Sequence, residues 1–205
     1  MYNYHLLMID DIYKTIASPS RGIYKDKGSK FLAFAYPVIS ENEVRNILLE
    51  LKKDYYDARH HCYAYRLGAD GSAWRANDDG EPSSSAGKPI LGQLLSMELT
   101  NVVVFVIRYF GGIKLGVPGL IFAYRAATAD ALSNAQIIEK TDDTLFSLQF
   151  SYAVMNDIMK LIKDEQPEII NQNFDLSCNI TLSIRKSKAE ILKEKLLKIE
   201  SVEID

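Results

Sequence analysis

The alternation of apolar and polar positions divides the chain into short strands and helices. Residues 102–107 form an unbroken run of β-branched and aromatic side chains, which predicts a strand buried on both faces. A glycine-rich turn follows, and from Leu120 apolar residues recur at helical spacing. Near the start, residues 12–17, 22–25 and 30–36 are predicted to form the short strands of a meander.

Two helix starts are indicated by a hydroxyl residue that is followed three positions later by Glu. Ser40 with Glu43, and Ser187 with Glu190, each fit a capping box, and apolar residues at helical spacing follow both pairs. We therefore expect both serines to cap helices. A further helix is predicted to begin at Pro89.

Residues 57–67 are predicted to form a strand whose side chains alternate between two faces. His60 and Cys62 share one face, and Tyr63 and Tyr65 share the other. His60 is thus a candidate acid–base group, and a Cys62/His60 nucleophile pair is conceivable. The alternative is that Cys62 is a small buried hydrophobe and His60 a polar residue at the rim.

The last third of the chain repeats strand and helix patterns in a recognisable order. Beyond the charged, turn-forming residues 139–144 the order is β-α-β-β-α-β, which predicts a ferredoxin-like domain with helices on one face of an antiparallel sheet. The predicted fold class is therefore α+β with two domains, residues 1–140 and residues 141–205. Cys178 falls on the apolar side of its strand and is expected in the core.

Charge and composition narrow the function. The chain has 24 Lys+Arg against 27 Asp+Glu, a net charge of −3, which argues against coating by nucleic acid through bulk electrostatics. Residues 1–140 have 16 cations against 15 acids and residues 141–205 have 8 against 12, so a polyanion would need a local patch in the first part. There is no secretion signal, no apolar run of membrane-spanning length and no disulfide or zinc spacing, so we expect a cytoplasmic protein that needs no cofactor.

The glycine-rich turn after the buried strand is the leading candidate site. Gly111, Gly112 and Gly116 allow backbone N–H groups to approach a bound group closely, and a helix N-terminus favours an anion. Arg108 and Lys114 bracket the turn and add positive charge. The alternative is a tight turn in which the glycines solve only a steric problem.

A second candidate is the loop of acidic residues and serines before Pro89. Asp78, Asp79 and Glu81 could hold Mg²⁺ or act as general acids and bases. Ser84 and Ser85 precede a helix start and suit phosphate capture. The alternative is a solvated turn, since Asp-Gly and Glu-Pro are common turn formers.

Three motifs resemble the signatures of the YigZ/IMPACT family in both order and spacing. They comprise residues 57–65, residues 78–82 with 86–91, and residues 100–124. The resemblance covers roughly residues 20–132, and the C-terminal part is similar to the extra domain of bacterial members. One departure is Val117-Pro118, where small flexible residues are expected.

The resemblance implies the folds of both domains and a role connected with translation. It implies an N-terminal two-layer domain like the second domain of a small-subunit ribosomal protein, and a C-terminal domain like the last domain of the translocating elongation factor. Eukaryotic relatives regulate translation in the stress response to amino-acid starvation, by competing for the activator of a stress kinase. They carry a different additional domain, so that mechanism is not transferred here.

Three functions therefore compete. The first is a binding module of translation that contacts RNA, the ribosome or a ribosome-associated protein through Arg108, Lys114 and the strand of residues 57–65. The second is a hydrolase or transferase of phosphate esters or nucleotides, with Asp78, Asp79 and Glu81 handling a metal such as Mg²⁺. The third is an interaction protein whose motifs only maintain the fold. We favour binding, because no nucleophile–base pair stands out.

Overall fold

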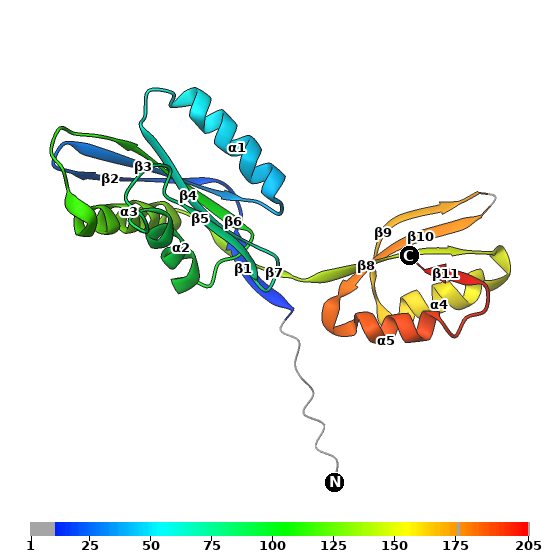
Figure 1. Ribbon diagram of the computed structural model, residues 1–205. Coiled ribbons are helices and arrows are strands. Elements are labelled where there is room, and N and C mark those ends of the chain that lie inside the picture. The colour runs from blue at the N-terminus through cyan, green and yellow to red at the C-terminus, as the bar shows by residue number, and fades with distance from the viewer. Residues whose placement is uncertain (1–10, 176, 205) are drawn as a thin grey trace, which may run out of the picture. The chain divides into compact units, whose positions relative to one another are not determined.

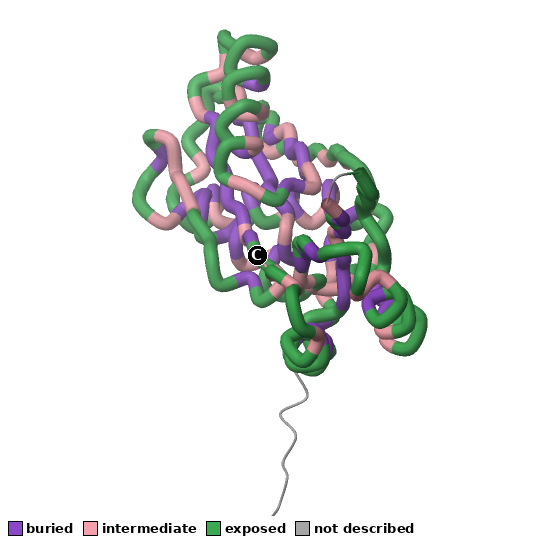
Figure 2. The backbone as a smooth tube through the Cα atoms, turned by 90° about the vertical axis from the view of Figure 1, so that its right-hand side faces the viewer, coloured by how far each residue is buried: buried purple, intermediate pink, exposed green. Residues whose placement is uncertain are grey.

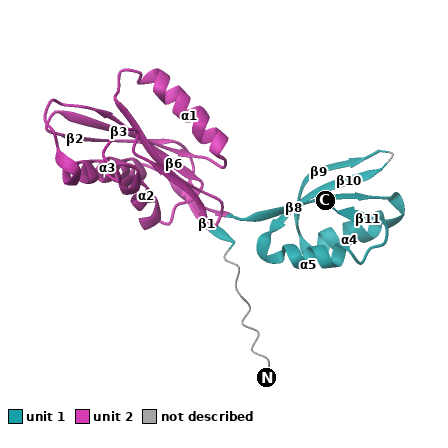
Figure 3. Cartoon of the chain, in the orientation of Figure 1, with its two compact units in different colours: residues 1–12, 141–205 teal, residues 13–140 magenta. Residues whose placement is uncertain are grey.

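The structure is a computed structural model that describes residues 11–175 and 177–204. Helices and antiparallel sheets occur together along the chain, so the predicted α+β class is confirmed. The internal contacts divide the chain into two compact units, Tyr13–Lys140 and Thr141–Asp205, and residues 11–12 group with the second unit (Figure 3).

The larger unit is built on a five-stranded antiparallel sheet with the strand order β2-β3-β6-β4-β5 (Figure 1). The central strand is β6, and its residues 102–107 are fully buried, which confirms the predicted strand that is apolar on both faces. Buried and exposed stretches alternate along the backbone (Figure 2). The five strands are β2 (Ser20–Asp26), β3 (Ser29–Pro37), β4 (His60–Leu67), β5 (Ala73–Asn77) and β6 (Val102–Tyr109).

Helices cover both faces of this sheet (Figure 1). The first helix, α1 (Glu41–Asp54), packs on one face through Val44 and Leu51, whereas α2 (Gly87–Ser96) and α3 (Gly116–Ser133) cover the other. The expected two-layer domain is therefore wrong, because the unit has three layers. The physical reason is that the central strands are apolar on both faces, and each apolar face must be covered.

The first strand of the chain pairs outside this sheet. β1 (Ile12–Ile16) joins β7 (Ile137–Thr141) in a two-stranded sheet, and the Ala17 amide beside it donates to the Gln136 carbonyl at 2.9 Å. The predicted meander is therefore wrong for its first strand. Its partner lies at the far end of the unit in sequence, which local patterning does not reveal.

The smaller unit has a four-stranded antiparallel sheet with the strand order β11-β8-β10-β9. Its elements follow the predicted β-α-β-β-α-β order, and α4 and α5 pack on one face in a shared core that includes the buried Cys178. The elements are β8 (Asp143–Phe150), a short 3₁₀ turn (Tyr152–Val154), α4 (Met155–Glu165), β9 (Glu168–Phe174), β10 (Cys178–Arg185), α5 (Lys186–Leu196) and β11 (Val202–Ile204).

Only one of the two predicted helix caps is present. The Ser40 hydroxyl accepts the Glu43 amide at 3.3 Å at the start of α1. At α5 the cap position is Arg185, and the Ser187 hydroxyl instead donates to the Asp11 carboxylate at 2.6 Å. The predicted cap at Ser187 is wrong because a carboxylate from elsewhere in the sequence takes its hydroxyl. Among the described residues, no helix is long and apolar enough to span a membrane.

Candidate functional site

A cavity lies where β4 begins, β6 ends and α3 begins. The antiparallel pairing places His60 opposite Arg108, so the start of β4 and the end of β6 meet at one end of the sheet. The turn after β6 then leads into α3. We call this space of about 530 Å³ the β4–α3 cavity, and it is lined by Arg59, His60, Gly80, Glu81, Pro82, Arg108, Phe110, Lys114, Leu115, Gly116, Val117 and Leu120.

The predicted site residues divide between this cavity and other places. Those that line the cavity are His60, Glu81, Arg108, Lys114 and Gly116. Those that lie outside it are Tyr65, Asp78, Asp79, Ser84, Ser85, Gly111 and Gly112.

Arg108 lines the cavity as a buried cation that is fixed on several sides. Its Nη1 donates to the Glu81 Oε1 at 2.6 Å, and both side chains are at least nine-tenths buried. Its guanidinium carbon lies 5.5 Å from the centroid of the Phe31 ring and 5.7 Å from that of Phe110, within the range of a cation–π contact. The Nε of Arg108 has no hydrogen-bond partner among the described residues.

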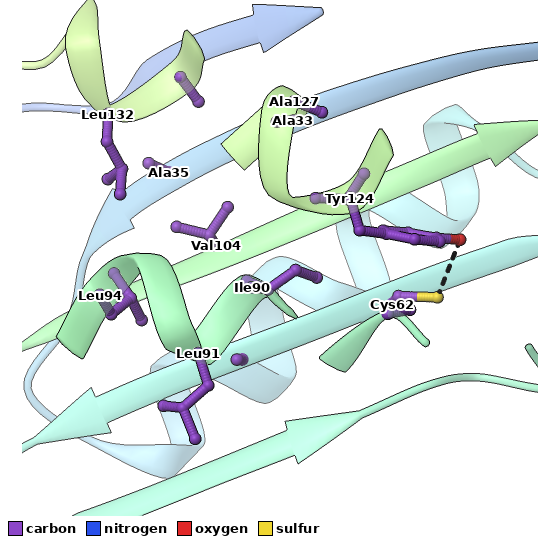
Figure 4. Close-up of a cluster of buried hydrophobic side chains, with 14 of the residues drawn as sticks. Ala33, Ala35, Cys62, Ile90, Leu91, Leu94, Val104, Tyr124, Ala127 and Leu132 are labelled. Carbon is purple, nitrogen blue, oxygen red and sulfur yellow. Dashed lines mark hydrogen bonds between the residues drawn. The ribbon is translucent and has the colours of Figure 1, made fainter. Parts of the chain in front are cut away.

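Glu81 also accepts a hydrogen bond from a residue of the buried core. The Tyr124 hydroxyl donates to Glu81 Oε1 at 2.8 Å, and the Cys62 thiol lies 3.3 Å from that hydroxyl in the core of the unit (Figure 4). Burial raises the pKa of the Cys62 thiol well above its usual range, and burial likewise raises the pKa of Tyr124. Cys62 therefore stays a protonated core residue, and the conceivable Cys62/His60 pair is absent because the thiol contacts Tyr124 and the Asp78 carbonyl instead.

His60 is held in one orientation at the edge of the cavity. Its Nδ1 lies 2.8 Å from the Asp79 carbonyl oxygen. Because a carbonyl oxygen only accepts, Nδ1 must carry the hydrogen, and Nε2 is the nitrogen left for a ligand. His60 can therefore accept a hydrogen bond when neutral, or donate one when protonated.

The side chains of Asp78 and Asp79 in the acidic loop accept hydrogen bonds from backbone amides. The Asp78 carboxylate accepts the amides of Ser84, Ala86 and Gly87 at 2.8–2.9 Å, which satisfies amides at the start of α2. The Asp79 Oδ2 accepts the His61 amide at 2.6 Å. Among the described residues, no group of three or more His, Cys, Asp or Glu side chains could hold a metal ion. The carboxylates of both aspartates therefore accept backbone amides of the protein itself.

The predicted serines and Tyr65 also lie apart from the cavity. Ser84 lines a different cavity of about 360 Å³ together with Lys88 and Arg125, and the buried Ser85 hydroxyl donates to the Pro82 carbonyl. Tyr65 points to the α1 face of the sheet, where its hydroxyl donates to Glu41 at 2.8 Å. Burial, followed by the bond to Glu41, raises the pKa of Tyr65 to about 12.

The glycines of the turn have separate roles. A Cβ on Gly111 would lie 1.9 Å from the carbonyl carbon of Gly28, so this position requires glycine for close backbone packing. Gly112 and Gly116 have φ of +88° and +72°, which favours glycine at both. Only Gly116 lines the cavity. Close backbone packing therefore accounts for the glycine at position 111, and Gly116 is the turn glycine that contributes to the cavity lining.

The cavity is electropositive. Arg59 and Lys114 are exposed at its edge, and neither forms an ion pair with an acidic side chain in the described part of the chain. The first turn of α3 contains no acidic residue, and its cap residue Leu115 makes no side-chain hydrogen bond to the helix. The partial positive charge of this helix start is therefore not offset by a side chain of its own turn.

Sequence reasoning missed Arg59 and Phe110 as site residues. Arg59 directly precedes His60, and Phe110 stands two residues after Arg108, so both were near positions already singled out. Their closeness in sequence to the paired ends of β4 and β6 is the feature that could have identified them. Tyr124 lies four positions after Leu120, at helical spacing, and it is fully buried, but its hydrogen bond to Glu81 does not follow from that spacing.

Comparison with known proteins gives consistent matches. The family described as Impact N-terminal domain matches residues 27–132. An IMPACT family member of Haemophilus influenzae is 32% identical over 172 residues, which are 83% of this chain and 84% of that protein. The IMPACT family member YigZ of Escherichia coli is 30% identical over 182 residues, which are 88% of this chain and 89% of that protein.

One solved structure matches most of the chain. It is described as the crystal structure of a hypothetical protein, and it aligns with a TM-score of 0.72 and 28% sequence identity. The alignment covers 95% of this chain and 96% of that chain.

Proposed function

Because the chain belongs to the IMPACT family, in the YigZ-like type with a further C-terminal region, we propose that it is an RNA-binding module of translation. The β4–α3 cavity would hold the RNA backbone. This proposal keeps the translation and stress-response setting that the family resemblance implies for eukaryotic members. It also includes the ribosomal-protein-like class for residues 13–140 and the ferredoxin-like class for residues 141–204. The order β11-β8-β10-β9 supports the second class.

The observation that carries the proposal is the concentration of unpaired positive charge at one cavity. The whole chain has a net charge of −3, yet Arg59 and Lys114 line the cavity beside the start of α3 and form no ion pair with any acidic side chain that the structure describes. An acidic protein that gathers cations at one place is suited to a local anionic ligand. RNA is favoured over a protein partner because a phosphate oxygen can accept from arginine, lysine and helix amides together.

No comparable observation supports the phosphate-ester enzyme. The carboxylates of Asp78 and Asp79 are engaged by backbone amides, and Glu81 is paired with Arg108. The Ser85 hydroxyl is buried and donates to a carbonyl. We therefore put forward the binding function alone.

The test is RNA and ribosome binding by the full chain and by Lys114→Gln and Arg59→Gln. Each variant should bind single-stranded RNA about 3- to 10-fold more weakly and reduce the salt dependence of the affinity, since each removes one phosphate contact. The matched control is Arg75→Gln, which removes an exposed arginine of β5 that is not part of the cavity. It should bind like the parent.

Ribosome sedimentation from lysate, with and without RNase, separates RNA from protein partners. Co-sedimentation that RNase abolishes supports the proposal. Co-sedimentation that survives complete RNA digestion, together with equal RNA binding by all four proteins, would overturn it and indicate a ribosome-associated protein partner instead.

A further inference from the structure

We propose that the β4–α3 cavity binds a nucleoside phosphate, with a terminal phosphoryl group at the cationic side and the base on Phe110. This inference rests on the proposed function in using the same cavity, and it names the chemical unit that enters it. The same unit can come from a free nucleotide or from the phosphorylated end of an RNA strand.

The first support is that the buried side chain of Arg108 has a hydrogen-bond donor without a partner among the described residues. Its guanidinium is nine-tenths buried, lies between two aromatic rings and has its charge balanced by Glu81. Its Nε nevertheless has no hydrogen-bond partner in the described part of the protein. A buried N–H without an acceptor is unfavourable, and Arg108 lines the cavity. An acceptor oxygen that enters the cavity would therefore meet a guanidinium that is already held in place.

The second support is the charge of the cavity. The charges of Arg108 and Glu81 cancel, which leaves Arg59 and Lys114 as two positive charges without acidic partners on the described residues. The start of α3, which no side chain caps, also lines the cavity and adds amide donors. A terminal phosphate carries nearly two negative charges at neutral pH, whereas an internal phosphodiester carries one. The charge of the cavity therefore matches a terminal phosphate better.

The third support is the apolar part of the cavity lining. Leu115, Val117 and Leu120 contribute to it, and Phe110 is 51% exposed although it is aromatic. An exposed ring next to an arginine provides a surface on which a base can stack. The volume of about 530 Å³ lies within the usual range for small-molecule sites, about 300–1,000 Å³. A bare phosphate would leave these apolar side chains uncovered.

The test measures binding of adenosine monophosphate, adenosine and inorganic phosphate to the full chain by calorimetric titration. Adenosine monophosphate should bind at least 10-fold more tightly than either fragment. Phe110→Ala should weaken its binding about 10-fold and leave inorganic phosphate unchanged, because it removes stacking alone. Lys114→Gln should weaken adenosine monophosphate and phosphate equally.

The matched control for the ring is Phe122→Ala. Phe122 is an exposed phenylalanine of α3 that does not line the cavity, and its removal should leave nucleotide binding unchanged. Thermal unfolding of each variant, followed by circular dichroism, identifies any loss of binding that comes from loss of structure.

Two short RNAs of one sequence, with a 5′-phosphate or a 5′-hydroxyl, distinguish the sources. Tighter binding of the phosphorylated RNA, by about 10-fold or more and in competition with adenosine monophosphate, supports the strand end as ligand. Equal binding of both RNAs, with tight binding of adenosine monophosphate, supports the free nucleotide.

The inference is overturned if adenosine monophosphate binds no better than inorganic phosphate and the two RNAs bind equally. It is also overturned if Phe110→Ala leaves nucleotide binding intact. RNA binding that persists in either case, and that Lys114→Gln weakens, would leave the proposed function standing alone. Nucleotide binding without any RNA or ribosome binding would instead contradict the proposed function and support this inference.

Discussion

At the scale of single residues, the buried ion pair of Arg108 and Glu81 is sensitive to the loss of either partner. Both charged groups are removed from water, and each depends on the other for compensation. Tyr124 donates a further hydrogen bond to the same carboxylate oxygen. The pair therefore holds the acidic loop and the end of β6 together, and it fixes the guanidinium that the proposed ligand would meet.

Glu81→Gln tests this role. The variant keeps the shape of the side chain but leaves the Arg108 charge buried without a counter-charge. We expect the free energy of unfolding to fall by about 3–5 kcal/mol, measured by urea titration. The control is Glu98→Gln, which breaks the exposed pair with Lys14 and should leave the free energy of unfolding close to that of the parent, because solvent screens this pair. An equal decrease in the free energy of unfolding in the two variants would show that the buried pair contributes no more to stability than the exposed pair.

At the scale of elements, the turn between β6 and α3 combines close backbone packing with part of the cavity lining. Gly111 lies against the β2–β3 turn, and its amide lies 3.1 Å from the Ser29 hydroxyl, which accepts it. Gly116 starts the helix and lines the cavity. Only four residues, 112–115, lie between these two glycines along the chain.

Gly111→Ala should destabilise the larger unit. The added Cβ would overlap the Gly28 carbonyl carbon, so the two turns must move apart, at a cost of about 1–3 kcal/mol or more. Chemical denaturation monitored by circular dichroism gives the measurement. Gly92→Ala is the control, because that helical glycine has nothing within 4 Å of the new atom and should gain up to about 1 kcal/mol. A Gly111→Ala variant as stable as the parent would refute the packing role.

At the scale of the whole molecule, the chain consists of two units that each bury their own core. The larger unit has two clusters of buried side chains, one on each face of its sheet, and the smaller unit has one. Each cluster is composed of residues from a single unit, so the burial that stabilises one unit does not require the other.

A fragment of residues 1–140 should therefore fold by itself. We expect cooperative urea unfolding and well-dispersed amide signals in its NMR spectrum, because both clusters of the larger unit are retained. A fragment with poorly dispersed amide signals and no cooperative unfolding transition would contradict the predicted division into residues 1–140 and 141–205.

The outcome for individual strands shows how far sequence reasoning reached. The alternation in residues 57–67 correctly separated His60 and Cys62 from Tyr65, and the apolar run of residues 102–107 correctly predicted a buried strand. The same apolar run also implied that both faces of the sheet need cover, so the third layer could have been expected. The pairing of β1 with β7 could not, because nothing local in either strand identifies its partner.

The sequence by itself determined the alternating faces, the helical spacings, the two-part organisation of the pattern and the family. These features follow from backbone geometry and from motifs that lie close together along the chain. Only the tertiary structure decided that Arg108 pairs with Glu81, that Asp78 caps α2, and that Arg59 and Phe110 join the cavity. Those contacts depend on which strand ends and loops become neighbours, and burial then determines whether a charge is paired within the protein or left for a ligand.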